Sequence, residues 1–114
     1  MQIINILSDI VYGETKPAIK VLIDTTYIKE IRIVFKIGQE MKQHKTDYPI
    51  VIHIIEGKIN FGVETERFLL NKGDIITLDA GVPHDLIAEE DSIIRLSLNK
   101  ADKTERVNQL LNQY

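Results

Sequence analysis

Apolar and polar residues alternate over most of the chain, in short runs separated by turn residues. Such alternation is typical of strands that bury one face, because successive side chains of a strand point to opposite sides. Turn residues recur at nearly regular spacing, which favours an all-β sandwich or barrel. The pattern predicts strands over residues 19–24, 31–37, 50–55, 59–63, 68–70, 75–78, 85–88 and 93–98.

The two ends of the chain carry apolar residues at helical spacing instead. The residues near the start are Ile3, Ile6, Leu7 and Ile10, which predict a short amphipathic helix. The residues near the end are Val107, Leu110, Leu111 and Tyr114, which predict a helix over about residues 102–113. We therefore expect one domain over residues 1–114, with its barrel core over about residues 19–98.

Composition agrees with a β-rich fold, because the chain contains 20 Ile and 7 Val among 114 residues. The net charge of −3 leaves no broad basic surface, so a nucleic-acid partner is not expected. Charged residues interrupt the chain often enough that no membrane span is expected. The chain contains no cysteine, which excludes disulfides and thiolate chemistry, and we take a cytoplasmic location as the default.

Three histidines are present, and two of them, His44 and His84, follow a glycine within a few residues. His44 comes six residues after Gly38, and His84 comes three residues after Gly81. We expect His44 to begin a strand and the bend at Gly81 to deliver His84 to the start of the next one. Two histidines that project from neighbouring strands into one barrel interior can meet on a small ligand or a metal.

The spacing resembles the two motifs of the cupin superfamily. The first motif is matched at Gly38, His44, Glu56 and Gly57, and the second at Gly73, Gly81, Pro83 and His84, with Asp79 where the family has proline. The resemblance covers about residues 31–98. It implies a double-stranded β-helix, the RmlC-like jelly-roll barrel of cupins, and a similarity to the ligand-binding half of AraC-type regulators.

Cupins that bind a metal usually use two histidines and a glutamate of the first motif and the histidine of the second. In this chain Thr46 occupies the second histidine position, and Ile50 occupies the glutamate position. The resemblance therefore implies two of four ligands, His44 and His84. Three ligands or more hold a first-row metal in most catalytic sites, so the cofactor is left open: a divalent transition metal with an incomplete ligand set, or none.

Two further residues are weaker site candidates. His53 lies three residues after Ile50, and this odd offset places it on the opposite face of a regular strand unless a β-bulge intervenes. Tyr48 precedes Pro49, which holds it extended, either as part of a pocket mouth or as an aromatic plug over the barrel end.

Three functions fit these residues. The first is a small-molecule-binding or sensing module, which the loss of two metal ligands favours. The second is a metal-dependent enzyme of the dioxygenase or isomerase type that acts through His44 and His84. The third is a metal-free enzyme in which a histidine is the general acid or base. Whether the chain is an enzyme, and which small molecule is its ligand or substrate, are left open.

A homodimer is the expected assembly. The Ile50–Ile55 run has apolar residues at both strand parities, and only one face of a barrel strand can meet the core. The other face needs cover from the terminal segments or from a second subunit.

Overall fold

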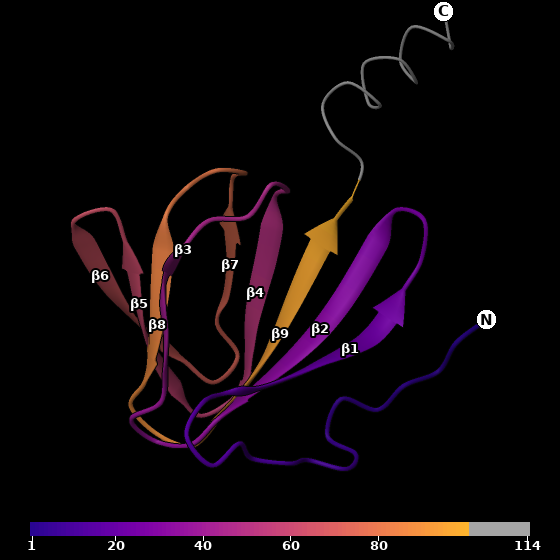
Figure 1. The fold of residues 1–114 in the computed structure, drawn as a ribbon, viewed down its shortest axis with the longest axis horizontal. Coiled ribbons are helices and arrows are strands. Elements are labelled where there is room, and N and C mark those ends of the chain that lie inside the picture. The colour runs from indigo at the N-terminus through magenta and orange to yellow at the C-terminus, as the bar shows by residue number, and fades with distance from the viewer. Residues whose placement is uncertain (101–114) are drawn as a thin grey trace, which may run out of the picture.

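The computed structural model describes residues 1–100, which form nine β-strands in two antiparallel layers (Figure 1). The strands are β1 (Ala18–Asp24), β2 (Ile28–Phe35), β3 (Glu40–His44), β4 (Ile50–Glu56), β5 (Lys58–Val63), β6 (Glu66–Asn71), β7 (Ile75–Leu78), β8 (His84–Ala88) and β9 (Ser92–Asn99). One sheet has the order β1-β2-β9-β4-β7, and the other has the order β3-β8-β5-β6. This two-layer arrangement confirms the all-β jelly roll.

For most strands, the first and last residues expected from the sequence agree with those of the structure to within a few residues. The helix expected over residues 102–113 lies outside the described residues. Within residues 1–100, no helix is long and apolar enough to cross a membrane.

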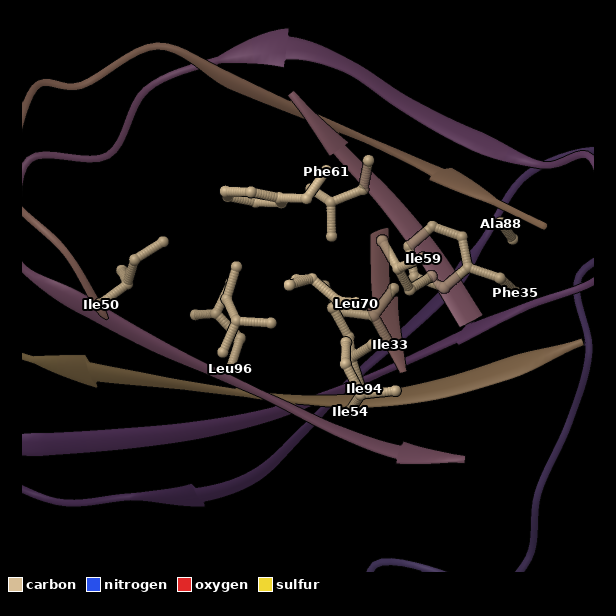
Figure 2. Close-up of a cluster of buried hydrophobic side chains, with 12 residues drawn as sticks. Ile33, Phe35, Ile50, Ile54, Ile59, Phe61, Leu70, Ala88, Ile94 and Leu96 are labelled. Atoms are coloured by element: carbon tan, nitrogen blue, oxygen red, sulfur yellow. The ribbon is translucent and has the colours of Figure 1, made fainter. Parts of the chain in front are cut away.

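The core lies between the two sheets and follows the alternation in the sequence. In β4, Ile50, Ile52 and Ile54 are at most 2% exposed, whereas the residues between them are only partly buried. These isoleucines join a cluster that includes Phe61 and Leu70 of the opposite sheet, and Figure 2 shows the side chains gathered between the layers. Full burial of each such side chain contributes on the order of 1.5–3 kcal/mol.

A single glycine links the two layers between β4 and β5. Gly57 has a φ of 92°, and a Cβ there would lie 2.2 Å from the Oγ of Ser92. The same Oγ accepts a hydrogen bond from the amide of Lys58 at 3.0 Å. A glycine is therefore required by the backbone conformation and by the close approach of β9.

The N-terminal helix predicted from Ile3–Ile10 is wrong, because this segment forms an irregular stretch with a turn at residues 6–9. The Oδ1 of Asn5 accepts the amide of Leu7 at 2.9 Å, which favours a turn over a helix. The guanidinium of Arg32, on the outer face of β2, donates to the carbonyls of Ile6, Ser8 and Asp9. These long-range bonds satisfy the backbone oxygens and hold the segment against the five-stranded sheet.

Candidate functional site

His44 and His84 lie side by side on two neighbouring strands of the four-stranded sheet. They are direct partners in the register of β3 and β8. Their ring centroids are 4.3 Å apart, with 60° between the ring planes. His84 is only 1% exposed, whereas His44 is partly buried. The structure therefore brings together the two histidines that the motif spacing singled out.

A β-bulge places His44 on the inner face. Met41 pairs with Leu86 and His44 pairs with His84, so a step of three residues along β3 faces a step of two along β8. Without the extra residue, the odd offset would put His44 and Met41 on opposite faces. The structure also corrects the expectation that His44 begins a strand, because His44 is the last residue of β3.

The expected bend at Gly81 positions His84. Gly81 has a φ of 79°, and His84 is the first residue of β8. The amide of Gly81 donates to the carbonyl of Thr46 at 2.8 Å. This bond joins the loop before His84 to the loop after His44, so both histidines are held by the same pair of loops.

Both imidazoles are fixed through Nδ1. The Nδ1 of His84 lies 2.9 Å from the carbonyl oxygen of Val82, and the Nδ1 of His44 lies 2.7 Å from that of Lys42. A carbonyl oxygen only accepts, so each Nδ1 carries the proton and donates it. In the neutral ring Nε2 then presents a lone pair. Within the described residues, the buried Nε2 of His84 has no hydrogen-bond partner.

Burial keeps His84 in its neutral form. Desolvation lowers the pKa of His84 below 6.5, and the neighbouring His44 lowers it further, against the smaller opposing effects of the hydrogen bond to Val82 and of Asp85. Asp85 lies on the other face of β8, where Arg67 binds it through two hydrogen bonds of 2.7 and 3.1 Å. That pairing lowers the pKa of Asp85, so the carboxylate stays ionised and bound to Arg67.

An apolar cavity of about 310 Å³ lies beside two neighbours of His84, although neither histidine is among the residues that line it. The ring of Phe61 stacks on His84 with a centroid distance of 5.8 Å, and Val63 pairs with His84 across β5 and β8. Both residues also line the cavity, whose wall is completed by Phe68, Leu70, Ile76, Thr77 and Leu78. Sequence reasoning missed these residues as site residues. The alternation Ile59, Phe61, Val63 indicated the inward face of β5, but only the register with β8 brings Phe61 to His84.

The two weaker candidates lie elsewhere. His53 alternates with the core residues Ile52 and Ile54, and it pairs with Ile75 and Arg95 on the outer face of the five-stranded sheet. Tyr48 is partly buried in the bend between β3 and β4, where its carbonyl accepts a bond of 2.8 Å from the hydroxyl of Thr46.

The residues present do not fit a tightly held metal ion. Two imidazoles with fixed Nδ1 atoms would suit one, because such hydrogen bonds orient metal-binding histidines. Across residues 1–100, however, no group of three or more His, Cys, Asp or Glu residues converges. Ile50, at the family's glutamate position, is 2% exposed and contributes hydrocarbon to the core.

The chain belongs to the cupin family. The sequence pattern of the family described as "Cupin domain" matches residues 31–98, which is more than half of the chain. No curated protein sequence matches this chain.

Solved structures share the fold at low sequence identity. An RmlC-like cupin from Desulfovibrio desulfuricans has a TM-score of 0.80 and 19% identity, over 87% of this chain and 96% of that one. The protein TT1209 from Thermus thermophilus has a TM-score of 0.79 and 21% identity, over 87% and 98%. KdgF from Halomonas sp. has a TM-score of 0.66 and 21% identity, over 75% and 81%. At such identities the likeness concerns the fold alone.

Proposed function

We propose that this cupin binds an uncharged small molecule through His44 and His84. The observation that carries the proposal is the Nε2 atom of His84, which is buried and has no hydrogen-bond partner among residues 1–100. An unpaired buried polar atom costs about 1–3 kcal/mol, and a bound hydrogen-bond donor would remove that cost.

The chemistry of the pair defines the ligand. Neutral imidazoles bonded through Nδ1 accept at Nε2, so the ligand needs a hydroxyl or an N–H group that donates. The cavity beside Phe61 is apolar, so the rest of the ligand is hydrocarbon or aromatic. Its volume of about 310 Å³ is at the small end of the range of about 300–1,000 Å³ for ligand pockets, which favours a compact molecule.

A matched pair of probes tests this proposal. Phenol donates a hydrogen bond, and anisole has the same ring but no donor. We expect phenol to bind more tightly than anisole in titrations followed by NMR, with a loss of that preference in His84→Gln. His53→Gln is the matched control, because His53 lies on the outer face of the other sheet. Equal binding of both probes, or binding of neither, would overturn the proposal.

A metal-dependent enzyme of the dioxygenase or isomerase type is the second candidate. The two Nε2 lone pairs favour it, and the shortage of a third protein ligand in residues 1–100 argues against it. Metal analysis of protein purified without chelator or nickel resin separates the two. A near-stoichiometric transition metal that is lost in His84→Gln would replace our proposal with this one. A sensing role like that of AraC-type regulators stays within the first proposal, as one use of a ligand-binding barrel.

A further inference from the structure

A second groove, of about 550 Å³, lies at the end of the five-stranded sheet at which β9 finishes. Among its lining residues that lie in strands, the majority occupy outward-facing positions of the register. Val51 lies between Thr77 and Ser97 in one row across three strands, and Ile28 pairs with Asn99 in the next row. The groove is therefore distinct from the cavity at the histidine pair, with which it shares only residues of β7.

The rim of this groove is apolar and open. Tyr27 is 50% exposed and Ile28 is 49% exposed, and both line it. Pro49 and Val51 add apolar surface from β4 and the loop before it. Apolar surface of this kind gains about 25 cal/mol per Å² when it is covered.

The last described residue, Lys100, lies at the edge of the groove. The amide of Lys100 donates to the carbonyl of Tyr27 at 2.7 Å, and the Nζ of Lys100 pairs with Asp24. Lys100 therefore lies at the β1–β2 side of the groove, where these two interactions hold it. The amide of Asn99 also donates to the carbonyl of Pro49, on the other side.

The sequence beyond Lys100 contains apolar residues that could cover this groove. Residues 101–106 are mostly polar, and the next eight contain Val107, Leu110, Leu111 and Tyr114. Six extended residues reach about 20 Å, whereas the groove crosses four strands spaced about 4.8 Å apart, which is about 14 Å. The tether is thus long enough for the apolar residues to reach any part of the groove.

We propose that residues 107–114 bind in this groove of their own chain, through Val107, Leu110, Leu111 and Tyr114. An intramolecular segment on a short tether has an effective concentration in the millimolar range, well above that of a second copy at micromolar protein. The segment covers the outer face at the ends of β2, β9, β4 and β7, and this role is independent of ligand binding at His44 and His84.

A spin label in the full-length chain tests the proposal. The chain contains no cysteine, so Gln113→Cys provides one attachment site. We expect the label to broaden the amide signals of Val51, Thr77 and Ser97 by more than half. The signals of Asn60 and Arg67, on the opposite sheet, should keep their intensity and serve as internal controls. Adding Leu110→Glu and Leu111→Glu should restore the groove signals, whereas Asn108→Glu and Asn112→Glu should not.

Mixed samples identify the occupant. The proposal requires that the spin label broaden signals of its own molecule. In a mixture of spin-labelled chain without ¹⁵N and ¹⁵N-enriched chain without the label, the groove signals of the ¹⁵N-enriched chain should therefore not broaden. Broadening between molecules would overturn the proposal in favour of a second copy. An absence of broadening in either sample, or broadening that survives the glutamate substitutions, would also overturn it.

Discussion

The imidazole rings of His44 and His84 lie 4.3 Å apart although 40 positions separate them in the sequence. Each ring donates its Nδ1 proton to the carbonyl two residues earlier, so Nε2 is the ring atom left for a ligand in our proposal. Phe61 and Val63, which line the apolar cavity, are the residues that connect this pair to it.

The stability of the protein should depend on pH through His84. Folding lowers the pKa of His84 below 6.5, so this histidine favours the folded state above pH 6.5 and loses that contribution as the pH falls through the lower folded-state value. We expect the free energy of unfolding in urea to decrease from about pH 7.5 to about pH 5.5. The pKa values of Asp85 and Asp24 are lowered from 3.8, so their contributions change only in more acidic solution.

The variant His84→Gln should have a flatter pH dependence in that range. Unchanged slopes in His84→Gln would mean that other groups cause the effect. The partner His44 is present in both proteins, so the comparison isolates the buried ring.

The inner face of β4 should tolerate truncation poorly. Ile54 is 0% exposed within the core cluster, so Ile54→Ala should cost about 2–5 kcal/mol in the free energy of unfolding. Ile75 is 60% exposed, and Ile75→Ala should cost less than about 1 kcal/mol. Similar losses at both positions, measured by urea unfolding, would contradict the assignment of inner and outer faces.

Gly81 should be sensitive to substitution for conformational reasons alone. Its φ is 79°, and a Cβ there would meet no atom within 4 Å. We expect Gly81→Ala to cost about 1–2 kcal/mol, and Gly81→Asn to cost less because asparagine tolerates this conformation better. At Gly57 a Cβ would also collide with Ser92, so Gly57→Ala should be more damaging than Gly81→Ala. The reverse order in thermal or urea unfolding would contradict this reasoning.

The homodimer stays a prediction, and the structure suggests where to test it. Ile19 and Val21 of β1 are 59% and 46% exposed, more than the partly buried Val51 and Ile55 that prompted the expectation. We expect light scattering at micromolar concentration to give about twice 13.1 kDa, and Ile19→Lys to shift the mass toward the monomer. A constant monomer mass over a wide concentration range would contradict the dimer.

Local sequence patterns predicted the core strands well because these strands bury one face. Ile50, Ile52 and Ile54 repeat at the period of the pleat, and the structure buries all three. The N-terminal prediction failed because the competing interactions come from Arg32, more than twenty residues away, and helical spacing carries no information about them.

The candidate site was predictable only in part. The glycine spacing around His44 and His84 identified the pair, and strand parity placed His53 on the outer face. The bulge in β3 and the approach of Phe61 to His84 arise from the register between strands, which a single sequence does not specify. The apolar cavity was missed for the same reason.

The most direct test of the account is the protonation state of the ring nitrogens of His84 at pH 7. A long-range ¹H–¹⁵N NMR spectrum distinguishes protonated from unprotonated ring nitrogens, and His84→Gln assigns the signals. Our account predicts a protonated Nδ1, bonded to the carbonyl of Val82, and an unprotonated Nε2 that shifts when phenol is added. A protonated Nε2, in either the other tautomer or the charged ring, would contradict the claim that this site accepts hydrogen bonds from its ligand.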